Sequence, residues 1–189
     1  LASQILNLQK NLGCSLVLTA YNNNFTYFNN LKKNFTTINF LNDKIDDAGP
    51  LGGVHAALDV LCNSNAGKGS AIELLVLPVD MPQMTPQLLK TLVSAGREAQ
   101  RSVYVKKRFL PFYLSVMHNT KAILTHYLVD QNKRRVVGFL ESLDAIALEE
   151  ANLARPKRVN GVQEKQNEKI TRMDEAQWLN VNTPGDWPD

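Results

Sequence analysis

The sequence lacks several features that mark specialised classes of protein. Its two cysteines, Cys14 and Cys62, have no metal-motif spacing, which favours reduced, core-lining thiols of a cytoplasmic protein over a disulfide. No apolar stretch approaches membrane-spanning length, and no segment resembles a secretory signal. The formal net charge of +3 comes without a long basic run, which argues against dedicated nucleic-acid binding.

What is present is typical of one globular domain. The chain has 189 residues, 44% of them hydrophobic and 21% charged, and it shows no internal repeat or low-complexity tract. We therefore expect a single domain over residues 1–189. Residues 152–177 are polar and charged with little periodicity, and we interpret them as an exposed excursion from that domain.

The stretch Ile72–Pro82 dominates the pattern. Its continuous apolar run predicts a strand buried on both faces of a sheet. Asp80 stands between two prolines, which cannot continue a central strand, so it lies where the strand passes into a loop. Ligands of open α/β sheets bind outside the carboxyl ends of strands, and a carboxylate is a hard ligand suited to Mg²⁺. Asp80 is therefore a candidate metal ligand.

Strands and helices alternate around this stretch, which predicts an α/β fold with a mostly parallel sheet covered on both faces. A basic turn, 106–108, joins two of the strands, and Gly96 is predicted to end the helix that Thr85 caps. The predicted strands include 15–20, 36–41, 102–105, 112–117 and 145–148, and the predicted helices include 2–12, 25–33, 50–61, 85–96, 119–128 and 135–143.

A glycine-rich segment precedes the helix that begins at Pro50. Proline suits the first turn of a helix, and the glycines permit close approach of a ligand to the backbone. The N–H groups and dipole of a helix N-terminus favour an anion. The segment Gly49–Val54 is therefore a second candidate binding site.

Three segments in order resemble the molybdenum cofactor guanylyltransferases: Gly49–Val54, Leu77–Pro82 and Leu179–Pro184. The resemblance covers essentially the whole chain outside the polar excursion. It implies a three-layer, Rossmann-like nucleotidyltransferase that transfers GMP from GTP to molybdopterin and releases pyrophosphate. It also implies Mg²⁺ as cofactor, and molybdoenzymes or their chaperones as partners.

The resemblance also implies roles for individual residues. Asp80 would be the catalytic residue and Mg²⁺ ligand. The residues of the nucleotide pocket would be Asn22, Asp43, Gly49, Pro50, Leu51 and Gly52. Those on the molybdopterin side would be Arg134, Asn180 and Asn182. Positioning and electrostatics, rather than a protein nucleophile, would supply most of the acceleration.

The sequence leaves alternatives to GMP transfer open. Cytidylyl transfer to the same cofactor is a close variant; guanine is favoured because Gly49–Leu51 and Asn180–Asn182 resemble the guanylyl branch. The family's N-terminal glycine-rich phosphate loop would lie before Leu1, and the opening residues have the pattern of a helix interior. Either a segment upstream of Leu1 supplies that loop, or the polypeptide lacks it. A polypeptide without it would bind GTP poorly and act as a non-catalytic binder of molybdopterin.

Overall fold

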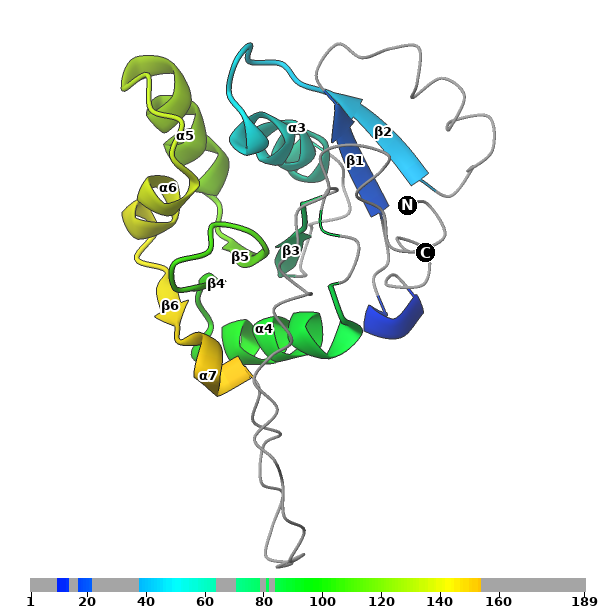
Figure 1. Cartoon of the computed structure of the whole chain (residues 1–189). Coiled ribbons are helices and arrows are strands. Elements are labelled where there is room, and N and C mark those ends of the chain that lie inside the picture. Colours follow the sequence, from blue (N-terminus) through cyan, green and yellow to red (C-terminus); the bar gives the residue numbers. More distant parts are fainter. Residues whose placement is uncertain are drawn as a thin grey trace, which may run out of the picture.

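The computed structural model describes residues 10–13, 17–21, 38–63, 71–78, 81 and 84–153. Strands and helices alternate along this part of the chain (Figure 1). The strands are β1 (Val17–Tyr21), β2 (Ile38–Asn42), β3 (Ile72–Val76), β4 (Val103–Val105), β5 (Phe112–Val116) and β6 (Ile146–Leu148). The helices are α3 (Pro50–Asn63), α4 (Pro86–Ala99), α5 (Thr120–Thr125) with a following π-helical turn η2 (His126–Asp130), α6 (Val136–Ser142) and α7 (Glu150–Leu153).

The described strands form two sheets. β1 and β2 pair in parallel, and the other four strands have the order β3-β5-β4-β6. β5 runs antiparallel to both β3 and β4, whereas β4 and β6 are parallel. Three of these four strands therefore point the same way, as expected for a mostly parallel sheet. The reversed strand, β5, returns from β4 through the predicted basic turn, which Arg108 N–H closes on the Val105 carbonyl at 2.9 Å.

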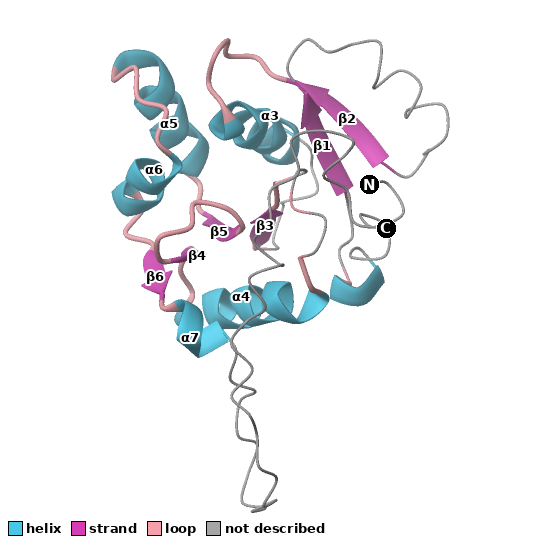
Figure 2. Ribbon diagram, viewed as in Figure 1, coloured by secondary structure: helices cyan, strands magenta, loops and turns pink. Residues whose placement is uncertain are grey.

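Helices cover both faces of the four-stranded sheet, which confirms the predicted α/β fold (Figure 2). Side chains of the β4–β5 hairpin pack with the helices on both faces of the sheet, because successive strand residues point to opposite faces. Phe112 and Leu114 pack with α3, α5 and α6, whereas Val103 and Tyr113 pack with α4 and α7. Phe112, Val103 and Leu114 are fully buried. Burial of each such side chain contributes about 1.5–3 kcal/mol.

β3 contributes to both layers. The sequence predicts that its apolar side chains are fully buried, but they are half-buried. Leu74 contacts the α3 side and Leu75 the α4 side. Glu73 is a polar exception within the apolar run. Its carboxylate accepts hydrogen bonds from the Arg97 guanidinium and, at 2.7 Å, from the Tyr113 hydroxyl. These two donors hold the pKa of Glu73 below its usual range, and β3 is thereby tied to α4 and β5.

α4 begins as predicted, because the Thr85 hydroxyl accepts a hydrogen bond from Leu88 N–H at 3.4 Å. The prediction that Gly96 ends this helix is wrong. The helix continues to Ala99, and Gln100 is the left-handed residue that closes it, with φ 52°. A Cβ on Gly96 would lie 2.2 Å from Cδ1 of Tyr113, so this glycine lets the helix approach β5 closely.

The cysteine prediction also needs correction. Cys62 was expected to line the core, but it is exposed, because it lies in the last turn of α3 beyond the residues that pack on the sheets. Cys14 lies outside the described residues. Among the residues that the structure describes, no helix has the length and apolar character needed to cross a membrane.

At the other end of the described chain, helix α7 reaches two residues into the predicted polar excursion. Leu153 is buried against the α4 side of the sheet. The remainder of the excursion lies outside the described residues.

Candidate nucleotide-binding site

The structure describes about half of the predicted site residues. Asp43, Gly49, Pro50, Leu51, Gly52 and Arg134 are described, and all of them lie at or beside the start of α3. Asn22, Asp80, Asn180 and Asn182 lie outside the described residues. β3 ends at Val76, so the chain has left the strand before it reaches Asp80, as the two flanking prolines predict.

The first turn of α3 has the form expected from Gly49 and Pro50. Gly49 has φ +59°, a conformation that glycine adopts without steric cost, and Pro50 is the first helical residue. Gly52 N–H donates to the Gly49 carbonyl at 3.0 Å, and Leu51 is completely buried beneath the turn. The turn is therefore anchored from below, and its backbone faces the loop that leads into the helix.

The carboxylate of Asp43 lies directly against this turn. A Cβ on Gly52 would lie 2.9 Å from Oδ2 of Asp43 and 3.2 Å from Cβ of Ala48. Gly52 therefore leaves the space that the carboxylate occupies. A negative charge at this place is favoured by the N-terminal end of the helix dipole.

Asp43 has unused capacity to accept hydrogen bonds. Its Oδ1 atom is buried and has no hydrogen-bond partner among the residues that the structure describes. Burial raises the pKa of this carboxyl, because the charged form loses water that no donor replaces. A buried acceptor without a donor costs free energy, and native structures retain such groups at sites where a ligand or water supplies the donor.

The loop between Asp43 and Gly49 is joined to α3 by an ion pair, and the same carboxylate joins α3 to α5. Lys44 and Lys121 both donate to the carboxylate of Asp59, which lies on α3. The two ammonium groups hold the pKa of Asp59 well below its usual range. Sequence reasoning missed this group, because residues 15 and 62 positions apart give no local signal.

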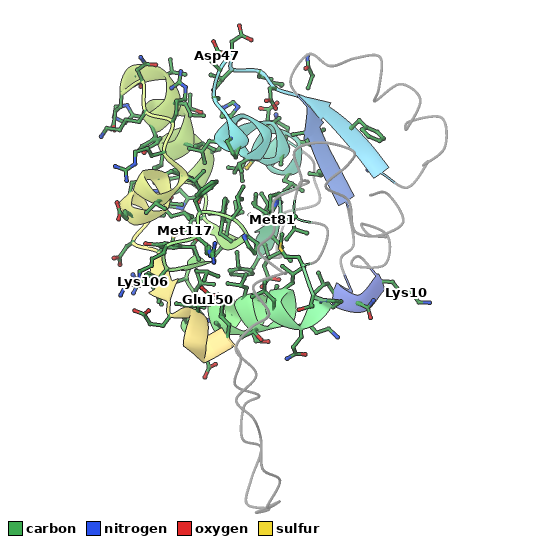
Figure 3. The ribbon with its side chains drawn as sticks, in the orientation of Figure 1. Lys10, Asp47, Met81, Lys106, Met117 and Glu150 are labelled. Carbon is green, nitrogen blue, oxygen red and sulfur yellow. The ribbon has the colours of Figure 1, made fainter. Side chains whose placement is uncertain are left out.

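Arg134 fastens the same loop from the other side. Its Nε–H donates to the carbonyl of Asp47 at 3.0 Å, and Nη1 donates to the carbonyl of Leu128 at 2.6 Å. Figure 3 shows Asp47 in the loop that leads into α3. Arg134, which the family resemblance assigns to the molybdopterin side, is therefore close to the predicted nucleotide segment, and every acceptor that the structure gives it is a backbone carbonyl.

His55 lies one turn further along α3 and is 8% exposed. The Thr125 hydroxyl donates to the Lys121 carbonyl at 2.9 Å, so its oxygen accepts from Nε2 of His55 at 3.0 Å. This assigns the hydrogen to Nε2 and leaves Nδ1 as a buried acceptor for which the described residues provide no donor. Burial, followed by the nearby Lys121 charge, lowers the pKa of His55, which fits a packing role.

The described residues include no group of three or more histidine, cysteine, aspartate or glutamate side chains that could hold a metal ion. Mg²⁺ in phosphate-transfer sites usually needs only one or two carboxylates besides the phosphates of the substrate. The Asp43 carboxylate is of the right chemical kind. However, it lies at the helix start, and the carboxylate predicted for the metal is Asp80.

Comparison with known proteins identifies the family of this chain. The family model described as MobA-like NTP transferase domain matches residues 1–146. The match includes Asp43, the Gly49–Gly52 turn, Asp80 and Arg134, and it ends before Asn180. No curated protein gives a match to the chain. The family match covers most of the chain and agrees with the observed α/β fold, so this protein belongs to the MobA-like NTP transferase family and is a nucleotidyltransferase.

Proposed function

We propose that the protein transfers GMP from GTP to molybdopterin, forming a molybdopterin guanine dinucleotide. The observation that supports this best is the Asp43 carboxylate, which lies against Gly52 with one buried oxygen that no donor in the described part of the chain reaches. The ordered resemblance of three sequence segments to the guanylyl branch adds the choice of substrate.

The chemistry of Asp43 suits the nucleoside part of GTP. A carboxylate repels a triphosphate but accepts hydrogen bonds from N–H and O–H groups. Guanine offers adjacent ring N–H and amino N–H donors, whereas the corresponding edge of cytosine offers only its amino group. A buried carboxylate with an unused oxygen therefore favours guanine over cytosine, and it can also accept from a ribose hydroxyl.

The proposed reaction is a substitution at phosphorus. An oxygen of the terminal phosphate of molybdopterin bonds to the α-phosphorus of GTP, and the bond from that phosphorus to the bridging oxygen breaks to release pyrophosphate. The protein brings the two anions together and orients them. When bound, Mg²⁺ would neutralise charge on the reacting phosphates, and Asp80 is the residue we propose to hold it.

The test compares GTP and CTP as substrates of the full-length protein with molybdopterin, and then repeats the comparison with Asp43→Asn. We expect turnover of GTP in preference to CTP. We also expect Asp43→Asn to lower kcat/KM for GTP about 10- to 100-fold, because a hydrogen bond to a charged acceptor contributes about 1.5–3 kcal/mol.

The matched control is Asp46→Asn, which removes the same charge from an exposed position of the same loop. It should leave kcat/KM within about twofold, since surface substitutions have small effects. A preference for CTP, or an equal loss in the two variants, would refute the proposal that Asp43 recognises guanosine.

A further inference from the structure

Arg134 lies beside the candidate site, and its contacts indicate how it acts. We propose that Arg134 is a positioning residue that holds the Asp43–Gly49 loop in its nucleotide-binding form, and that it does not itself contact substrate. This inference rests on the proposed function, because it assigns the loop to GTP.

The Arg134 guanidinium group donates hydrogen bonds to backbone carbonyls on two sides. Of its five N–H donors, one goes to the Asp47 carbonyl in the loop and two go to the carbonyls of Leu128 and Lys133, at 2.6 and 3.1 Å. Leu128 belongs to η2, at the end of the α5–η2 helix, where a cation is favoured by the free carbonyls. Arg134 therefore links the loop to the end of that helix.

The loop contains one left-handed residue that an external contact can stabilise. Asp47 has φ 52° and Gly49 has φ 59°, on either side of Ala48, and only the glycine adopts this conformation without cost. Aspartate tolerates the left-handed region better than most residues but is still uncommon there, so contacts that hold its backbone favour the observed conformation. Two contacts do so here: Ala48 is 2% exposed in the core, and Arg134 binds the Asp47 carbonyl.

The contact of Arg134 with the Asp47 carbonyl can affect the candidate site because the residues between them are few. Asp47 is four residues from Asp43 and two from Gly49, and a Cβ built on Gly52 would lie 3.2 Å from Ala48 Cβ as well as 2.9 Å from Oδ2 of Asp43. Release of the Asp47 carbonyl would free Ala48 and Gly49 to move, and the space around Asp43 would change with them. A planar guanidinium fork meets carbonyls on both sides at once, which a lysine ammonium does less well.

The test uses the full-length protein with Mg²⁺ and GTP, without molybdopterin, and measures GTP affinity by calorimetry. We expect Arg134→Gln to weaken GTP binding about tenfold and Arg134→Lys to weaken it less. The matched control is Arg135→Gln, because Arg135 is exposed and its side chain has no hydrogen bond or ion pair within the described part of the chain. The control should bind GTP as the wild type does.

A second measurement separates positioning from direct contact. Hydrogen exchange of the ligand-free protein should show faster exchange of amides 44–49 in Arg134→Gln and unchanged exchange in Arg135→Gln. At saturating GTP, the KM for molybdopterin should change less than twofold. A raised KM for molybdopterin with unchanged GTP affinity and unchanged loop exchange would overturn the proposal and make Arg134 a substrate contact.

Failure of the proposed function would give a different result from failure of the Arg134 proposal. A wild-type protein that binds no GTP refutes the proposed function, whatever the variants do. The exchange of amides 44–49 in the ligand-free variants still decides whether Arg134 holds the loop. If Arg134→Gln does not fold, Arg134→Lys carries both measurements, and wild-type loop exchange and GTP affinity in that variant would overturn the proposal.

Discussion

Gly52→Ala is the substitution that most directly tests the geometry of the site. The new Cβ would lie 2.9 Å from Oδ2 of Asp43, about 0.5 Å closer than an ordinary van der Waals contact of ~3.4 Å. Ala48 Cβ, at 3.2 Å, is a second close contact of the new methyl. The carboxylate therefore has to move. Functional groups need to be held within about 0.5 Å of their productive position, so this shift is large enough to matter.

The expected loss of GTP affinity has an upper limit. Displacement cannot cost more than complete loss of the Asp43 hydrogen bond, about 1.5–3 kcal/mol, so we expect a loss between about 3- and 100-fold. Stability should change much less. Alanine in a helix gains up to about 1 kcal/mol over glycine, whereas overpacking costs about 1–3 kcal/mol, and these effects oppose each other.

The assay is a double-mutant cycle with Asp43→Ala, measured by GTP calorimetry and by thermal unfolding. Asp43→Ala removes the carboxylate that the new methyl would meet. In that background Gly52→Ala should leave GTP affinity unchanged and should change the melting temperature more favourably than in the wild type, because the methyl no longer meets the carboxylate and only the 3.2 Å contact with Ala48 Cβ remains. If the two substitutions weaken binding additively, Gly52 does not act through Asp43, and the argument fails.

Two further predictions concern Asp80 and His55. Asp80→Ala should lower metal-dependent turnover by about 10²-fold or more while the circular dichroism spectrum and the melting temperature stay unchanged, and normal turnover would remove Asp80 from the metal site. The pKa of His55 is lowered in the folded protein, so unfolded chains take up a proton first as pH falls below about 6.5, and stability should drop between pH 7 and 5. His55→Asn should flatten this part of the stability profile in urea titrations, and an unchanged slope would show that other groups cause it.

Local sequence signals predicted many of the elements correctly. Gly49 and Pro50 placed the start of α3, because glycine permits the left-handed conformation before the helix and proline fixes φ at the first helical residue. Thr85 placed the start of α4 in the same way. These signals succeed because a helix start is decided by a few adjacent residues.

Features that depend on distant residues were not predictable in this way. Gly96 looks like a helix end, but its role is set by the Tyr113 ring, which approaches from another strand. Arg134 looks like a solvated or phosphate-binding cation, and only the fold brings the Asp47 carbonyl to it. Only the family resemblance put Asp43 and Gly52 in one site. The residues between them do not predict the turn that brings the carboxylate to Gly52.

The position of α3 has a consequence for how the molecule opens. This helix packs against β1, β2 and α5, and its residues Leu51 and Leu58 share a buried cluster with side chains of β3. It thus covers both described sheets, and separating it would expose apolar surface on each. Its amides should therefore exchange only in a nearly global unfolding event. A nucleotide bound at its first turn would slow that event, and so would protect the two sheets together.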